Sequence, residues 1–211
     1  MTGSADWRST RFAVVDVETT GLDPARHEVL SIGIVDVVGG RVQVASAFYR
    51  ELRPATAPTA ETVVIHGIRP SDADRGLDPT AVGEEVVRRL DGRVVVAHVA
   101  RIERSFLGPW LEPLGWSFPR RVVDTDVLFR AHLVRAGLPV LHQHVGLGAA
   151  AQRFGLPEQR RHHALGDALT TAQLLLALAG SWPGGAPRLE DLLDADRLLR
   201  RRRLLRARRL T

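Results

Sequence analysis

The sequence predicts an α/β domain built on a mixed five-stranded sheet, and three observations support this prediction. Three apolar, β-branched runs lie early in the chain, with Gly39 and Gly40 between the second and the third. A Gly-Gly pair in that position is a strong hairpin signal, so the first three strands should form an antiparallel meander. Two shorter β-branched runs follow, and apolar residues at helical spacing lie between and after them. The 211-residue chain is long enough to bury the core of such a domain.

The expected elements can be read along the chain in order. The five strands are residues 12–17, 28–38, 41–52, 93–97 and 121–124. The expected helices are residues 80–90, a helix that begins just after His98, and residues 125–135, 147–154 and 163–179. Residues 53–60 and 137–146 are expected to be loops. Three antiparallel strands followed by alternating helices and strands is the order of the ribonuclease-H-like fold.

Positive charge is concentrated in the last part of the chain. Residues 1–187 carry 20 arginines and 20 acidic residues, whereas residues 188–211 carry nine arginines and four acidic residues. We therefore expect a disordered N-terminus over residues 1–10, a domain over residues 11–182, and an Arg-rich, helical tail over residues 183–211. Acidic residues come first in the tail and arginines last, which suits the helix dipole; contact with a phosphate backbone would explain the arginines equally well.

The composition excludes several classes of protein. The chain has no cysteine, which excludes a disulfide framework and a thiolate metal site. No apolar run approaches the roughly 20 residues that a membrane-spanning helix needs, and the first residues lack the apolar core of a signal peptide. We therefore expect a cytoplasmic protein without a membrane partner.

Two carboxylates interrupt the end of the first apolar run. Asp16 and Glu18 are two residues apart, and side chains at that spacing lie on the same face of a strand. Converging buried carboxylates repel each other unless a cation, a proton or a hydrogen-bond network compensates them. A hard divalent cation such as Mg²⁺ or Mn²⁺ suits oxygen ligands. The alternative is a strand that ends in a solvated acidic turn, with Gly21 and Pro24 as turn residues.

Longer motifs surround these carboxylates and recur downstream. The segment VVDVETTGLDP resembles the first motif of the DEDDh family of 3′–5′ exonucleases, which includes the proofreading (epsilon) subunit of bacterial replicative DNA polymerase. The third motif of that family has a His, an Ala two residues later and an Asp five residues after the His. The segment HHALGDA contains His162, Ala164 and Asp167 at this spacing. The resemblance implies that Asp167 binds metal and that His162 takes a proton from water, a role that suits histidine.

The second motif departs from the family pattern. Members usually read close to AH-Asn-x-x-Phe-Asp-x-x-Phe-Leu, whereas this chain reads AHVARIERSFL. Val99 therefore replaces the Asn, Ile102 the Phe and Glu103 the metal-binding Asp. A Glu can still bind metal, directly or through water, but Mg²⁺ demands near-ideal octahedral geometry. We expect lower activity or a shifted substrate preference compared with a proofreading subunit.

The resemblance also implies contacts with the substrate. The turn after the first carboxylates is expected to contact and wedge the last nucleotide, and the segment around IHGI is expected to help seat it. The residues assigned to these contacts are Thr19, Thr20, Gly21, Leu22, Glu61, His66 and His98. Asp124 and Thr125 match a further family pattern, an Asp-Thr pair after the fifth strand, which we interpret as structural.

The resemblance covers residues 11–180 and implies a metal-dependent exonuclease domain. Asp16, Glu18, Glu103 and Asp167 would hold two Mg²⁺ or Mn²⁺ ions about 4 Å apart. Hydrolysis would release nucleoside 5′-monophosphates from a free 3′ end, with single strands preferred because a duplex end must melt to reach a buried site. The expected context is proofreading or repair of DNA, with a polymerase or repair partner in trans. Two alternatives are an exonuclease that acts on RNA and a nucleic-acid-binding module that has lost catalysis.

Overall fold

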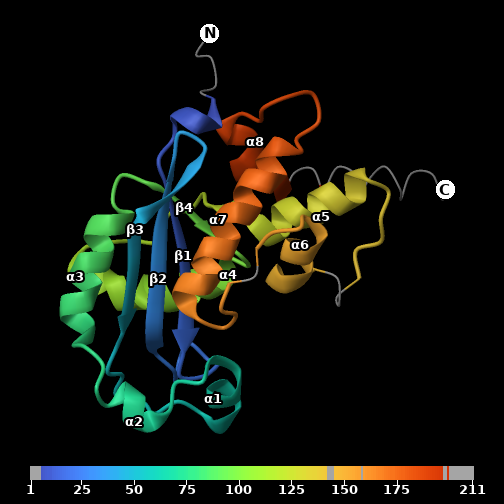
Figure 1. The fold of residues 1–211 in the computed structure, drawn as a ribbon. Helices are drawn as coiled ribbons and strands as arrows, with labels where there is room; N and C mark the ends of the chain where they lie inside the picture. Colours follow the sequence, from blue (N-terminus) through green and yellow to red (C-terminus); the bar gives the residue numbers. More distant parts are fainter. Residues whose placement is uncertain (1–5, 142–144, 158, 197–198, 200–211) are drawn as a thin grey trace, which may run out of the picture.

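A mixed sheet of five strands forms the centre of the structure (Figure 1). The computed structural model describes residues 6–141, 145–157, 159–196 and 199. The strands are β1 (Phe12–Thr19), β2 (Val29–Val38), β3 (Arg41–Glu51), β4 (Val94–Ala97) and β5 (Val123–Asp124). Their order is β3-β2-β1-β4-β5; β1, β2 and β3 pair antiparallel, and β4 and β5 are added parallel to β1. The predicted ribonuclease-H-like arrangement is confirmed.

Helices cover both faces of this sheet (Figure 1). They are α1 (Ala60–His66), α2 (Pro70–Ala73), α3 (Pro79–Leu90), α4 (Arg101–Leu111), α5 (Thr125–Arg135), α6 (Leu147–Arg153), α7 (Ala164–Gly180) and α8 (Leu189–Leu193), with short 3₁₀ helices at Trp7–Ser9 and Glu112–Leu114. Helices α5, α6 and α7 contribute to the core on one face, and α3 and α4 to the core on the other. No helix in the described part of the chain is long and apolar enough to cross a lipid bilayer.

The sequence analysis did not assign helices α1 and α2. Their local signals are short: the Thr59 hydroxyl accepts a 3.3 Å hydrogen bond from the Thr62 N–H, and Pro70 lies in the first turn of α2. Gly67 ends α1 with a left-handed φ of 77°. Helices of seven and four residues contain too few positions for an apolar periodicity to reveal them.

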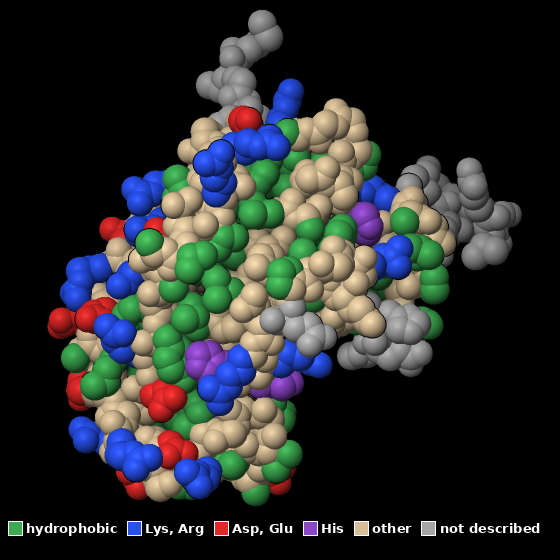
Figure 2. All heavy atoms as spheres, in the orientation of Figure 1, with side chains coloured by type: hydrophobic (Ala, Val, Ile, Leu, Met, Phe, Trp, Pro, Cys, Tyr) green, Lys and Arg blue, Asp and Glu red, His purple; other side chains and the backbone are tan. Residues whose placement is uncertain are grey.

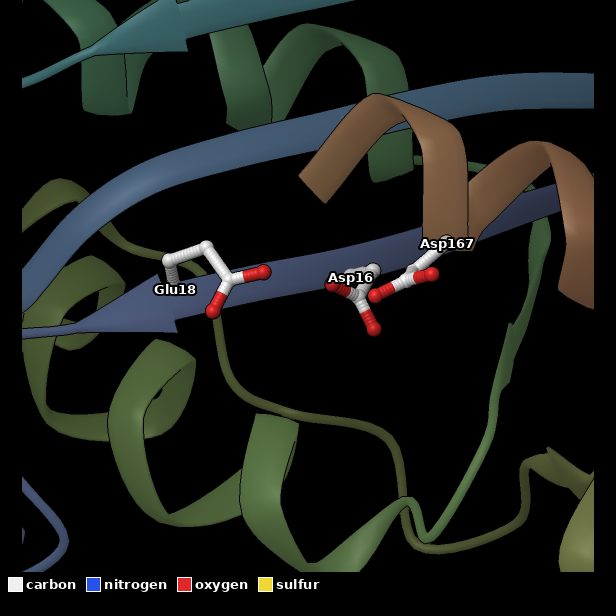
Figure 3. A group of neighbouring side chains, drawn as sticks. All are labelled: Asp16, Glu18 and Asp167. Atoms are coloured by element: carbon white, nitrogen blue, oxygen red, sulfur yellow. The ribbon is translucent and has the colours of Figure 1, made fainter. Parts of the chain in front are cut away.

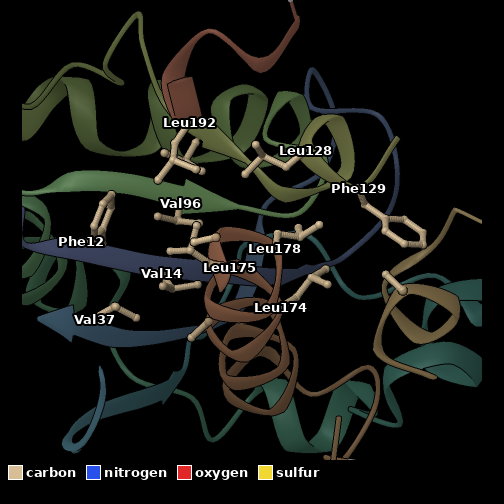
Figure 4. Close-up of a cluster of buried hydrophobic side chains, with 14 of the residues drawn as sticks. Phe12, Val14, Val37, Val96, Leu128, Phe129, Leu174, Leu175, Leu178 and Leu192 are labelled. Carbon is tan, nitrogen blue, oxygen red and sulfur yellow. The ribbon is translucent and has the colours of Figure 1, made fainter. Parts of the chain in front are cut away.

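Two hydrophobic clusters lie on opposite faces of the sheet, and they show to which face each β1 side chain points. Val14 belongs to the cluster that contains Leu175 of α7 (Figure 4). Val15 belongs to the cluster on the face of α3 and α4. Because strand side chains alternate between faces, Asp16 and Glu18 continue the face of Val14, toward α7.

The described part of the N-terminal segment, from Asp6, packs against the domain, whereas residues 1–10 were expected to be disordered. Trp7 is buried in the same cluster as α7, and its ring centroid lies 6.2 Å from that of Phe12. Asp6 forms an isolated antiparallel bridge with Arg188. Burial of the large apolar ring offsets the conformational entropy lost by this segment. Residues 1–5 lie outside the described residues.

The first part of the expected tail packs on the domain. Leu192 and Ala195 are buried in the same cluster as α7, and α8 lies against β5. Arg121 forms ion pairs with Glu190 and with Asp194, the latter at 3.1 Å. Residues 188–196 therefore pack on the domain, although they were expected to lie in the tail. Most of the arginine-rich remainder lies outside the described residues.

Candidate active site

Three carboxylates meet where β1 approaches the N-terminus of α7 (Figure 3). Asp16 and Glu18 extend from one face of β1, and Asp167 lies in the first turn of α7. One carboxylate oxygen of each residue lies within 4.8 Å of the others. Figure 3 shows the carboxylates of Asp16 and Asp167 close together, with Glu18 further along the strand. The fold thus brings together the carboxylates of the first and third sequence motifs.

Burial and mutual repulsion disfavour the charged forms of these groups. Burial raises the pKa of Asp16 well above its usual range, and the charges of Glu103, Glu18 and Asp167 raise it further. Burial and the charge of Asp167 raise the pKa of Glu18 to about 7. Burial also raises the pKa of Asp167, against the opposing effect of the His162 N–H. A divalent cation would relieve this repulsion, so the trio suits metal binding.

Glu103, in the first turn of α4, is the fourth carboxylate near this site. Its side chain is buried, and its Oε2 atom has no hydrogen-bond partner in the part of the chain that the structure describes. Burial raises its pKa to about 8, and the charges of Asp124 and Glu18 contribute. It lies outside the group of three whose oxygens meet within 4.8 Å, although its charge acts on Asp16. An unsatisfied buried carboxylate beside three others fits an oxygen-only set of ligands for Mg²⁺ or Mn²⁺.

His162 lies in the turn that leads into α7, and its side chain is exposed. Its backbone adopts a left-handed φ of 53°, which His tolerates better than β-branched residues do. Its N–H donates a 2.9 Å hydrogen bond to Oδ2 of Asp167. The charge of His162 lowers the pKa of both Asp167 and His66, so its ring lies near these residues. The five-residue spacing of the motif therefore corresponds to one hydrogen bond that closes the turn on the helix.

The neighbouring His163 is held in a different environment. Its ring stacks on that of Tyr49, with centroids 4.3 Å apart and an interplanar angle of 23°. Burial lowers the pKa of His163, and the nearby Arg160 lowers it further. The ring of His163 is thus packed on the edge strand whereas that of His162 is exposed, and the assignment of His162 as proton acceptor stays a prediction.

The turn after β1 is held together by its threonines. The Thr19 hydroxyl donates to the Gly21 carbonyl at 2.8 Å, and the Thr20 hydroxyl accepts from the Glu28 N–H at 3.0 Å. The Thr20 carbonyl accepts from the Thr59 N–H at 2.9 Å, which ties the turn to the start of α1. Both hydroxyls are thus engaged within the chain, and the expected contact of this turn with substrate stays a prediction.

Leu22 differs from the rest of this turn because 85% of its surface is exposed. Gly21, by contrast, is buried, and a Cβ there would come within 2.4 Å of the His27 ring. On α1, which is tied to the same turn, Val64 and Ile65 are also exposed. Large exposed apolar side chains beside a polar site are suited to contact nucleobases.

Glu61 and His66 lie at opposite ends of α1. Glu61 is exposed in the first turn, where hydrogen bonds from its own backbone and from Thr59 lower its pKa. His66 is buried at the last turn, and its Nδ1 accepts a 3.0 Å hydrogen bond from the Ile68 N–H. Burial lowers the pKa of His66, which favours the neutral form of the ring.

His98 and Asp124 connect the ends of β4 and β5 to the helices that follow. The Thr125 hydroxyl lies 3.2 Å from the Ala97 carbonyl and 3.0 Å from His98 Nδ1, and hydrogen bonds to both tie β5 to the end of β4. The Asp124 carboxylate caps the Val99 N–H at 3.1 Å and the first residues of α5. These contacts support the structural interpretation of Asp124 and Thr125. The assignment of His98 to substrate stays a prediction.

The sequence analysis missed Gly33, which lets α7 approach the sheet. A Cβ at Gly33 would come within 2.3 Å of the Ala164 backbone. The available signal was a glycine inside a strand, which often marks a close backbone approach. Tyr49 was also missed, because no local pattern predicts its contact with His163.

Comparison with known proteins gives a consistent result. An exonuclease family model (RNase_T) matches residues 13–175. A DNA polymerase III subunit epsilon-like protein of Rhodobacter capsulatus is 33% identical over 170 residues, which cover 79% of this chain and 23% of that protein. The chain spans less than a quarter of the length of this relative and of the PolC-type DNA polymerase III of Thermotoga that it also matches.

Solved structures that share the fold include two nucleases that the chain covers almost completely. Exonuclease X in complex with 5′ overhanging duplex DNA superposes with a TM-score of 0.65 at 22% identity, over 87% of this chain and 98% of that one. The nuclease domain of 3′hExo, described as a DEDDh family member bound to rAMP, superposes with a TM-score of 0.63 at 16% identity, over 82% of this chain and 92% of that one.

Proposed function

This chain belongs to the exonuclease family, and on that premise we propose that it is a metal-dependent 3′–5′ exonuclease that releases nucleoside 5′-monophosphates from single-stranded or frayed DNA. The observation that carries the proposal is the meeting of Asp16, Glu18 and Asp167 within 4.8 Å, next to the buried and unsatisfied Glu103. A chain without a use for a cation would be destabilised by these four groups. A role in proofreading or repair, with a polymerase or repair partner in trans, is part of the same proposal.

The four carboxylates are the proposed metal ligands. When bound, two Mg²⁺ or Mn²⁺ ions would activate the attacking water and stabilise the oxygen that leaves. Asp16 and Asp167 face each other and would together hold a metal ion. Glu103 approaches the same site from α4. His162, exposed and tied to Asp167 through its backbone, is the proposed proton acceptor.

The residues around the carboxylates suit an unpaired 3′ end. Leu22 projects from the turn beside Glu18 and is proposed to stack on or wedge the terminal base, and Glu61 and His66 of α1 are proposed to hold the terminal sugar. Figure 2 shows histidine and arginine side chains together around the lower end of α7, where the charge of the arginines would attract a phosphate backbone. The proposed preference for single strands follows from the burial of the carboxylates, because a paired end has to separate before it can reach them.

Degradation of labelled oligonucleotides tests the proposal. Single-stranded DNA, a 3′-recessed duplex and single-stranded RNA are incubated with Mg²⁺, Mn²⁺ or EDTA; a label at the 5′ end follows the shortening of each strand, and the released nucleotides are identified by chromatography with ultraviolet detection. We expect 5′-monophosphates from single-stranded DNA with either metal and none with EDTA. Asp16→Asn should abolish release, whereas Asp74→Asn, which changes an exposed carboxylate outside the cluster, should not.

The same assay separates the alternatives. Faster release from RNA would replace the DNA substrate with an RNA substrate. A wild-type protein that binds oligonucleotides but degrades none of them would overturn the exonuclease proposal in favour of a binding module. Release that persists in EDTA would overturn the role of the metal ions.

A further inference from the structure

The register of the sheet aligns three residues in one row under the N-terminus of α7. Asp16 of β1 pairs with Gly33 of β2, and Gly33 pairs with Tyr49 of β3. The row therefore runs from the carboxylate cluster to the edge of the sheet. Tyr49, at its outer end, is assigned no role in the proposed reaction.

Gly33 sets how closely α7 approaches this row. A Cβ at residue 33 would come within 2.3 Å of the carbonyl carbon of Ala164 and of the backbone nitrogen of Leu165. The first residues of α7 thus pack directly on β2. Asp167, which follows in the next half-turn, lies close to Asp16 as a result. The position of Asp167 is set by the packing of helix on sheet.

The turn before α7 has a separate anchor at Tyr49. The Tyr49 ring stacks on His163 at a centroid distance of 4.3 Å, and its hydroxyl donates a 2.7 Å hydrogen bond to Glu51. These two contacts, one within the edge strand and one against the turn before α7, orient the Tyr49 ring. His163 is the residue that follows His162 and is therefore restrained by the edge of the sheet.

His162 itself depends on restraints of this kind. Its ring is exposed and takes part in no hydrogen bond or ring stack with any other described residue. Its backbone is held at φ 53°, with its N–H bound to Asp167 on one side and the stacked His163 on the other. Loss of the stack would leave the backbone hydrogen bond as the local restraint on the turn.

We propose that Tyr49 is a positioning residue: by stacking on His163, it holds the turn that presents His162 to the carboxylate cluster. This inference rests on the proposed exonuclease function. Tyr49 belongs to none of the hydrophobic clusters of the core, so its effect on the reaction can be separated from an effect on the fold. In this proposal Tyr49 acts through His162, and the cycle below tests it against a direct contact with substrate.

A double-mutant cycle tests whether Tyr49 acts through His162. kcat and KM are measured on single-stranded DNA with Mn²⁺ for wild type, Tyr49→Ala, His162→Ala and the double variant. Misplacement of a catalytic group by about 1 Å costs up to about 100-fold, so we expect Tyr49→Ala to lower kcat about 10- to 100-fold and to leave KM within about twofold. In the His162→Ala background, Tyr49→Ala should have no further effect, because the group that it positions is absent.

Three controls accompany the cycle. Tyr49→Phe keeps the ring stack and loses the hydrogen bond to Glu51, so it should restore most of kcat. Val44→Ala shortens another side chain of the edge strand, 68% exposed, and should leave kcat unchanged. The rise in melting temperature that Mn²⁺ causes in Tyr49→Ala should match that of wild type, because the carboxylates are intact.

Several outcomes would overturn the inference, and they can be distinguished from failure of the proposed function. Equal effects of Tyr49→Ala in both backgrounds would assign Tyr49 to substrate binding or to the fold. Full activity of Tyr49→Ala, with a slow His162→Ala, would refute the positioning role alone. Full activity of His162→Ala would refute the role of His162 as proton acceptor and, with it, the positioning role of Tyr49. A wild-type protein that cleaves no substrate would refute the exonuclease function itself.

Discussion

Val99 donates its backbone N–H to Oδ1 of Asp124 at 3.1 Å while its own φ is 66°. The same Asp124 carboxylate accepts the Ala100 N–H at 3.0 Å, so it holds the start of α4 in place. The left-handed region is costly for a β-branched residue, because Cβ and its substituents crowd the backbone. The segment that leads to Glu103 is therefore strained at Val99, the position at which the family pattern has Asn.

Replacement of Val99 by Asn should relieve this strain. Asn adopts left-handed backbone at lower cost than Val, and the hydrogen bond from residue 99 to Asp124 uses only the backbone. We expect Val99→Asn to raise the free energy of unfolding by about 1 kcal/mol, the lower end of the cost of such a conformation. Urea unfolding monitored by circular dichroism measures this change in the free energy of unfolding. Val99→Ala, which loses the branch but keeps a Cβ, should raise the free energy of unfolding by less. An unchanged free energy of unfolding in Val99→Asn would show that the conformation is not strained.

Gly33→Ala tests the close approach of α7 to β2. A Cβ within 2.3 Å of the Ala164 backbone forces the helix away from the sheet. We expect a loss of about 1–3 kcal/mol in the free energy of unfolding, as for other overpacked sites, and a lower kcat because Asp167 retreats from Asp16. Gly108→Ala is the matched control: its Cβ would lie 4.0 Å from its nearest neighbour, Phe118, so it should be neutral or stabilising. Equal behaviour of the two variants would contradict the structure.

The metal-free protein should lose stability as the pH rises. Glu18 has a pKa of about 7 in the folded chain against 4.5 for an ordinary Glu, and that of Glu103 is about 8. Between 4.5 and these values the folded state binds more protons than the unfolded state, so the stabilisation is complete below pH 4.5 and is lost as the pH rises through 7 and 8. At about 1.4 kcal/mol per pKa unit, Glu18 alone accounts for at most roughly 3 kcal/mol.

Melting temperatures in EDTA from pH 5.5 to 9 measure this effect. Mn²⁺ should raise the melting temperature more at pH 8 than at pH 6, because metal binding requires the deprotonated carboxylates. In Glu18→Gln the dependence on pH should be weaker than in wild type. A metal-free melting temperature that stays level or rises over this range would contradict the raised pKa values.

Glu103→Gln should separate stability from activity. The change keeps the shape of the side chain and removes a buried charge that faces Asp16 and Glu18. We therefore expect a higher melting temperature than wild type at pH 8 in EDTA, together with a smaller rise on addition of Mn²⁺ and a kcat at least 10-fold lower. Glu112→Gln, an exposed change just after α4, should alter none of these quantities. An unchanged kcat in Glu103→Gln would exclude Glu103 from the metal ligands.

Much of the architecture could be predicted because its signals are local. The Gly39-Gly40 turn and the apolar runs around it predicted the antiparallel meander, and the alternation along β1 placed Asp16 and Glu18 on one face. Motif spacing also placed His162 and Asp167 together, and the structure shows the hydrogen bond behind that spacing. The short helices α1 and α2 were missed because their capping signals cover only a few residues.

The alignment of Asp16, Gly33 and Tyr49 in one row of the sheet could not be predicted from the same local signals. Continuing the pairing of Val38 with Arg41 residue by residue would place Ser46 opposite Gly33. A register shift between Ile34 and Asp36 places Tyr49 there instead, and Ser46 is used within the irregular segment, where its hydroxyl accepts the Asp36 N–H at 2.9 Å. Such a shift depends on packing and local hydrogen bonds, which leave no periodic trace in the sequence.

The sequence by itself determined which side chains share a face of a strand or a turn of a helix, because those relations follow from backbone geometry over a few residues. Tertiary structure alone decided how deeply Glu103 is buried, how closely α7 lies on Gly33, and that Tyr49 reaches His163. Each of these depends on contact between segments far apart in the chain. Burial and proximity, and hence the raised carboxylate pKa values, arise only when those segments pack.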